Sequence, residues 1–140
     1  QNVHVIGFHA TKRGNAVTDM ARLEPVLLLE YARLANENET DALARFVETW
    51  YAAPTYAASS PFGYSGSDPR ISKAYQVLRR LRSYADTVTL FETDMRPYLL
   101  AVLQWTLPAV TFTHWEPERK RLAAIMGGVL CERILGDETP

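Results

Sequence analysis

Apolar residues recur at helical spacing in several segments of the chain, and no segment alternates regularly between apolar and polar residues. The segment 41–52 carries four large apolar residues at spacings of three, one and three: Leu43, Phe46, Val47 and Trp50. This period is typical of a helix with one apolar face. Thr40 is a suitable amino-terminal cap, so the pattern predicts a helix from Asp41 to about Ala52.

A second apolar stripe at helical period follows Pro69, with Ser67 or Asp68 as the cap. Its members are Ile71, Ala74, Tyr75, Leu78 and Leu81. The basic residues of this segment occupy other faces and are expected in solvent: Arg70, Lys73, Arg79, Arg80 and Arg82. Ser83 allows a turn, so a separate short helix is expected from Tyr84 to Glu92.

Prolines mark the remaining helices. Pro25 suits the first turn of a helix that continues to Leu34, and it would kink a helix that starts earlier. Pro97 opens a helix that ends before Pro108. Pro117 opens the last helix, which stops at Gly136.

These segments predict an all-α protein of about six helices in stacked antiparallel pairs. We expect one domain over residues 1–140, with an extended arm at 1–16 and a carboxy-terminal helical extension at 111–140. The stretch 53–67 is expected to be a loop, because it is rich in Pro, Gly and Ser. Its aromatic residues, Tyr56, Phe62 and Tyr64, would lie either on the domain's own core or against a partner.

Composition excludes several classes of protein. Of 140 residues, 47% are hydrophobic and 22% charged, which is ordinary for a globular domain. The formal net charge of −1 argues against a protein that neutralises many phosphates. The most apolar window, 98–112, is interrupted by Pro108 and is shorter than the ~20 residues of a membrane helix. The single cysteine, Cys131, is expected to be buried.

The sequence contains no arrangement typical of catalysis. His4, His9 and His114 do not have the spacing of metal ligands, and the acidic residues at 37–41 are expected to favour a helix amino terminus. No carboxylate is marked out as lying in an apolar pocket. Gly127 and Gly128 fall inside the last helix and are expected to permit a close helix approach. We therefore expect no catalytic residue, cofactor or metal.

Part of the chain resembles a known family, subunit Va of mitochondrial cytochrome c oxidase. The similarity covers about residues 41–110. Its central motif is an Arg-Arg-Leu, an aromatic-Ala pair, a Thr-Val pair and a Glu, here Arg79, Arg80, Leu81, Tyr84, Ala85, Thr87, Val88 and Glu92. A Pro-Tyr then opens a helix with Leu and Thr-Leu, here Pro97, Tyr98, Leu103, Thr106 and Leu107. Residues that also fall in register are Arg45, Phe46, Val47, Trp50, Pro54, Ile71 and Ala74.

The resemblance implies a right-handed, helical-repeat-like superhelix without a cofactor. It implies a non-catalytic accessory subunit of cytochrome c oxidase, peripheral on the matrix face of the mitochondrial inner membrane. The partners would be other oxidase subunits, with no nucleic acid. The residues expected at their interface are Arg79, Arg80, Tyr84, Tyr56, Phe62, Tyr64 and Tyr98. The alternative is a helical-repeat module of the tetratricopeptide or pentatricopeptide kind that binds protein or RNA, either alone or as a subunit of another mitochondrial complex.

Overall fold

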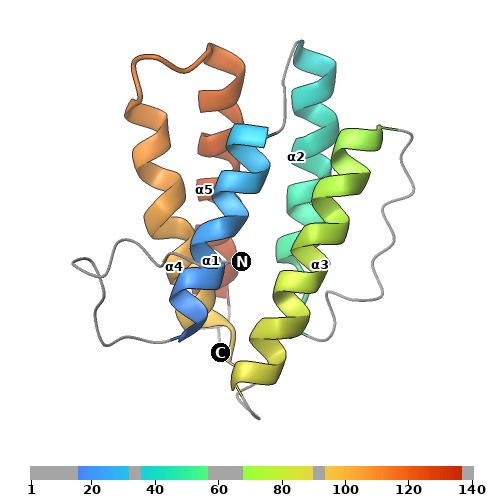
Figure 1. The fold of residues 1–140 in the computed structure, drawn as a ribbon. Coiled ribbons are helices and arrows are strands. Elements are labelled where there is room, and N and C mark those ends of the chain that lie inside the picture. The colour runs from blue at the N-terminus through green and yellow to red at the C-terminus, as the bar shows by residue number, and fades with distance from the viewer. Residues whose placement is uncertain (1–15, 32–35, 57–67, 90–93, 137–140) are drawn as a thin grey trace, which may run out of the picture.

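The computed structural model describes residues 16–31, 36–56, 68–89 and 94–136 (Figure 1). Within these ranges the regular structure is entirely helical, which confirms the all-α class. The elements are α1 (Ala16–Pro25), the π-helix η2 (Val26–Tyr31), α2 (Glu37–Tyr51), α3 (Pro69–Thr89), α4 (Arg96–Thr106), the 3-10 helix η4 (Leu107–Thr111) and α5 (Pro117–Gly136). The expected arm at 1–16 lies outside the described residues, apart from Ala16.

The helices form a bundle in which α1 packs on α3 and α4, while α5 packs on α2 and α4. Helices α2 and α3 run in the same direction (Figure 1). Their contacts confirm this, because Glu39 bonds Arg70, and Trp50 packs on Tyr75 and Arg82. The expected stacking of antiparallel pairs does not extend to α2 and α3, and the expected superhelix is not confirmed.

Pro25 ends α1, so the first helix starts earlier than its proline. A proline inside a helix cannot donate the backbone hydrogen bond to the carbonyl four residues back. Beyond Pro25 the chain continues in the wider π-helical turns of η2. Wide turns of this kind are rare and frequently lie at functional sites.

The amino end of α2 lies earlier than predicted. Asn36 is its cap, and its side-chain oxygen accepts a hydrogen bond from the backbone N–H of Glu39 at 3.0 Å. Thr40 lies inside the helix, where its hydroxyl donates to the carbonyl of Asn36. The prediction of Thr40 as cap is wrong because Asn36, four residues upstream, already accepts a hydrogen bond from a free backbone N–H of the first turn.

Helix α3 is continuous over 21 residues, so the predicted break at Ser83 is wrong. The buried face continues through Arg82 and Ala85 beyond the predicted end. Asp68 caps the other end as expected, since its Oδ1 accepts from the N–H of Arg70 at 2.8 Å. The unbroken α3 leaves five α-helices among the described residues instead of about six.

The carboxy-terminal half of the chain follows the prolines closely. Helix α4 ends before Pro108, and α5 runs from Pro117 to Gly136 as predicted. Gly127 is buried, and a Cβ added there would lie 3.1 Å from Cδ2 of Leu107. Gly128 has open space around it. The close approach expected at the glycine pair is thus confirmed at Gly127 only.

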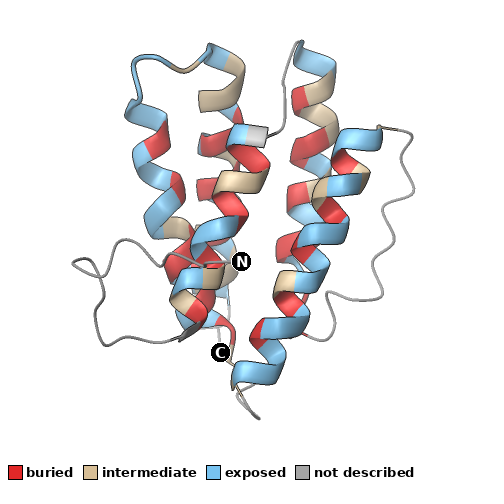
Figure 2. Cartoon of the chain, viewed as in Figure 1, coloured by how far each residue is buried: buried red, intermediate tan, exposed pale blue. Residues whose placement is uncertain are grey.

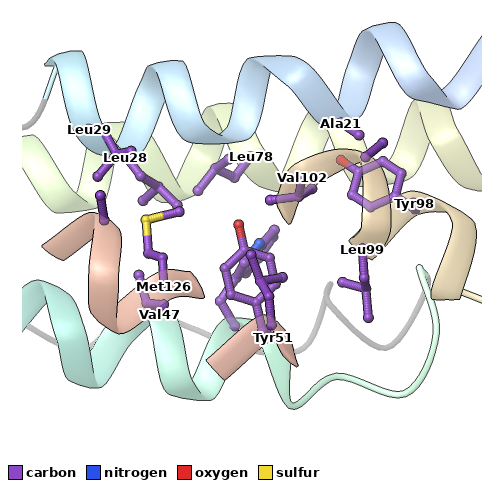
Figure 3. Close-up of a cluster of buried hydrophobic side chains, with 14 of the residues drawn as sticks. Ala21, Leu28, Leu29, Val47, Tyr51, Leu78, Tyr98, Leu99, Val102 and Met126 are labelled. Atoms are coloured by element: carbon purple, nitrogen blue, oxygen red, sulfur yellow. The ribbon is translucent and has the colours of Figure 1, made fainter. Parts of the chain in front are cut away.

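The core lies between the helices, and every described α-helix contributes buried apolar side chains to it (Figures 2 and 3). Large buried members include Leu28, Leu43, Leu78, Leu122 and Met126. Cys131 is only half-buried, contrary to expectation, because it lies toward the edge of the buried face of α5. None of the described helices is long and apolar enough to cross a membrane.

Candidate functional site

Three of the predicted interface residues lie exposed on α3. Arg79 and Arg80 are exposed, and Tyr84 is 64% exposed. Around Tyr84, Val77 and Val88 are 38% and 43% exposed, and Leu81 is half-buried. The spacing of these four apolar residues, four, three and four, places them on one face of the helix. We call Val77, Leu81, Tyr84 and Val88 the outer stripe of α3.

Two other predicted interface residues lie inside the protein. Tyr56 is 2% exposed and Tyr98 is fully buried, and their rings meet edge to face at 5.3 Å between centroids. Tyr98 is therefore not at a surface as expected, and Tyr56 lies on the protein's own core, which is one of the two alternatives given for it. Phe62 and Tyr64 lie outside the described residues.

The most unusual feature of the core is a buried carboxylate, Glu24 of α1. Its side chain is fully buried and forms an ion pair with Arg82 of α3, which is 1% exposed. Arg82 donates from Nε to Oε1 and from Nη2 to Oε2, the latter at 3.2 Å. This two-pronged geometry is the strongest form of carboxylate pairing. The expectation that Arg82 faces solvent is therefore wrong, and the core holds a carboxylate that was not marked out from the sequence.

Three aromatic donors complete the surroundings of Glu24. The Tyr98 hydroxyl donates to Oε1 at 2.6 Å, and the Tyr51 hydroxyl donates to Oε2 at 3.0 Å. The indole N–H of Trp50 lies 3.4 Å from Oε2. We call Glu24, Arg82, Trp50, Tyr51 and Tyr98 the charged core. Because its members come from α1, α2, α3 and α4, one carboxylate connects four helices; Figure 3 shows Tyr51 and Tyr98 among the surrounding apolar side chains.

The Arg82 guanidinium is also enclosed by aromatic rings. Its central carbon lies 4.7 Å from the ring centroid of Tyr98 and 4.9 Å from that of Trp50. Ring faces attract cations, and a guanidinium stacks well on them because it is planar and weakly hydrated. The rings therefore offset part of the cost of removing the charge from water.

Burial and the charge of Glu24 together set the protonation states of Arg82, Tyr51 and Tyr98. Burial raises the pKa of the Tyr51 and Tyr98 phenols well above the usual value, and the negative charge of Glu24 raises them further. Burial lowers the pKa of Arg82, but the Glu24 carboxylate outweighs this effect and holds the pKa above its ordinary value. The two tyrosines are thus neutral donors and Arg82 is a cation at every physiological pH.

The charged core is suited to holding helices together. A general acid or base must reach a substrate proton, whereas Glu24 is fully buried and already accepts hydrogen bonds on both oxygens. Among residues 16–31, 36–56, 68–89 and 94–136, no group of His, Cys, Asp and Glu side chains could hold a metal ion.

The spacing of the sequence contains a signal for the charged core. Arg82 continues the buried series Ile71, Tyr75, Leu78 and Ala85 at steps of four, three, four and three. Glu24 likewise belongs to a buried series on α1 and η2, with Val17, Ala21 and Leu28, at steps of four, three and four. A charged residue at an apolar position on each of two helices predicts a buried pair, although periodicity alone does not say that the two meet.

Several other basic residues are held by acidic partners on the surface. Arg121 of α5 bonds Asp41 of α2 at 2.9 Å, and Arg70 of α3 bonds Glu39 of α2 at 2.7 Å. These pairs join the amino ends of α2, α3 and α5. The basic groups that the sequence presents are therefore partly used within the fold.

Comparisons of the chain with protein-family models, with curated proteins and with solved structures found no significant match.

Proposed function

We propose that this chain is a non-catalytic helical subunit that docks on a larger assembly. The observation that carries the proposal is the outer stripe of α3. Its apolar residues recur at helical spacing, as in a stripe that faces a core, yet Val77, Tyr84 and Val88 are exposed. An ordered apolar stripe in solvent is typical of an interaction surface, whereas scattered exposed apolar residues are not.

The charged core supports the same proposal from inside. Its donors and acceptors bond one another, so these hydrogen bonds join the helices of the bundle to one another. A rigid bundle presents its surface residues in fixed positions, which lowers the entropic cost of association.

The resemblance over residues 41–110 is the basis for proposing which assembly the chain joins. We propose mitochondrial cytochrome c oxidase, with the chain peripheral on the matrix side and the haem and copper chemistry left to other subunits. Arg80 and Tyr84, which carry part of the resemblance, are also exposed on α3, where a partner can reach them.

The alternative, a repeat-type module that binds protein or RNA, has less support. Stacked repeats pack on their neighbours in sequence, whereas here α1 packs on α4 and α2 packs on α5. This packing counts equally against the superhelix that the resemblance implies, so the two proposals differ in support through charge. Arg82 is buried, and Arg70 and Arg121 are paired with carboxylates, which reduces the positive charge available to phosphates.

Affinity capture of the tagged chain from gently solubilised mitochondria tests the proposal. We expect oxidase core subunits to co-purify and a reduced-minus-oxidised spectrum to show a haem a band. Capture of a different large complex would keep the docking role and exclude the oxidase. Recovery of the chain alone would contradict the docking role, and RNA whose binding weakens with salt would favour the alternative.

A further inference from the structure

The outer stripe is a second apolar face of α3, distinct from the face in the core. The core face consists of Ile71, Tyr75, Leu78, Arg82 and Ala85. Successive residues of an α-helix are turned by about 100°, which places the centre of the outer stripe roughly 110° from the centre of the core face. Figure 2 shows exposed residues along the length of α3 beside its buried ones. Helix α3 thus has two apolar faces, of which one packs in the bundle and the other is largely exposed.

Charge is distributed unevenly around the outer stripe. Lys73 and Arg80 are exposed and lie seven residues apart, two turns along one edge of the stripe. At about 100° per residue, each is within roughly 60° of Val77 around the helix axis. Arg79 and Asp86, which are also exposed, fall on the opposite side of the helix. The edge of the stripe is therefore basic, and the exposed carboxylate of α3 lies elsewhere.

We propose that the outer stripe of α3 binds an amphipathic helix of a partner protein whose own apolar stripe is bordered by carboxylates. The four apolar residues of the outer stripe span three turns, which matches the spacing of anchors in helix–helix recognition. Carboxylates on the partner would meet Lys73 and Arg80, and complementary charge selects the partner and its orientation. This inference rests on the proposed function and specifies the chemistry of the partner.

A second copy of this chain fits the surface less well. Its outer stripe carries the same basic edge, because Lys73 and Arg80 would be present on both helices. Asp86 could not pair with the Lys73 and Arg80 of the other copy, since it lies on the far side of α3. The partner is therefore a different protein with an acidic border.

Two designed peptides test the proposal with the full-length chain. Both are 18-residue helices with Leu at i, i+3, i+4 and i+7; one has Glu along a border of the Leu stripe and the other has Lys. We expect the Glu peptide to bind at least about tenfold more tightly than the Lys peptide. In spectra of the isotopically labelled chain, the Glu peptide should shift the amide signals of Val77, Leu81, Tyr84 and Val88.

Charge-reversal variants provide a matched control. The double variant Lys73→Glu/Arg80→Glu should prefer the Lys peptide, whereas Arg79→Glu should bind both peptides as the wild type does. Circular dichroism should show the same helix content in all three proteins. The single variant Arg80→Glu changes the net charge as much as Arg79→Glu does. Equal effects of these two variants on peptide binding would overturn the proposal, because only net charge would then matter.

Other occupants give different results. A dimer in sedimentation that Tyr84→Glu dissociates would assign the outer stripe to a second copy. Binding of the Glu peptide only after residues 57–67 are replaced by a Gly-Ser linker would assign it to that segment. Either result, or the absence of binding to the intact chain, overturns the proposal. If the peptide does not bind but the oxidase still co-purifies, docking uses another surface and the proposed function stands.

Discussion

Glu24 has the largest expected effect of any single residue. Glu24→Gln keeps the size of the side chain and one acceptor oxygen, but it leaves the buried Arg82 cation without its counter-charge. Removing one partner of a buried pair costs about 3–5 kcal/mol. We expect a loss of this size in the free energy of unfolding, measured by urea denaturation.

A double-mutant cycle separates the pair from its surroundings. Arg82→Met alone leaves the buried Glu24 without its counter-charge. The double variant Glu24→Gln/Arg82→Met removes both charges, so it should lose less stability than the sum of the two single variants. Additive losses would show that Glu24 and Arg82 do not act on each other. Arg70→Met, which breaks an exposed pair, should have a smaller effect than either single variant.

The buried tyrosines predict a dependence of stability on alkaline pH. Tyr51 and Tyr98 have raised pKa values in the folded protein, so they stay protonated when the same residues of the unfolded chain ionise. Their stabilising contribution is complete below the unfolded pKa, near 10, and is lost as the pH rises toward the folded values. Each tyrosine adds about 1.4 kcal/mol per pH unit to the decline.

Tyr98→Phe tests this contribution. The variant lacks one ionisable phenol, so its unfolding free energy should fall less steeply above pH 10 than that of the wild type. At neutral pH it should be less stable by about 1.5–3 kcal/mol, the range for a hydrogen bond to a charged group. Equal slopes for the two proteins would show that Tyr98 ionises alike in the folded and unfolded states.

At the scale of the elements, Gly127 and Gly128 make a matched pair within α5. Replacing glycine by alanine inside a helix gains about 1 kcal/mol of propensity. Gly128→Ala meets nothing within 4 Å and should realise this gain. Gly127→Ala brings a methyl group to 3.1 Å from Leu107, so its gain should be smaller or reversed. Thermal unfolding should show a higher midpoint temperature for Gly128→Ala than for Gly127→Ala. Equal midpoints would contradict this prediction.

The elements also show how far the sequence predicts this fold. The ends of α4 and α5 could be predicted, because Pro97, Pro108, Pro117 and Gly136 act locally on the backbone. The break at Ser83 could not be excluded locally, because a serine is compatible with either a turn or a helix. The buried face on both sides of Ser83 keeps α3 intact, and that face depends on contacts with α1 and α2.

The charged core could be predicted only in part for a related reason. The positions of Glu24 and Arg82 on apolar faces are visible in the sequence, but their pairing spans 58 residues. The resemblance to the oxidase subunit places Tyr98 at an interface. Its hydroxyl instead bonds Glu24 within the core, a contact that periodicity on one helix cannot reveal.

At the scale of the whole molecule, the charged core and the outer stripe of α3 have separate roles. The charged core connects four helices and keeps the bundle in one arrangement, while the outer stripe of α3 remains available to a partner. Variants of the charged core should therefore reduce stability and docking together. Variants at the edge of the outer stripe should reduce docking while the unfolding free energy stays close to that of the wild type.

The most direct test of this account compares three tagged proteins after gentle solubilisation of the cells that express them. Native electrophoresis would separate the wild type, Arg79→Glu and Lys73→Glu/Arg80→Glu according to the size of the assembly that each enters. We predict that the wild type and Arg79→Glu migrate with a large complex and that the double variant migrates as a free chain. Migration of all three with the complex, or of all three as free chains, would contradict the account.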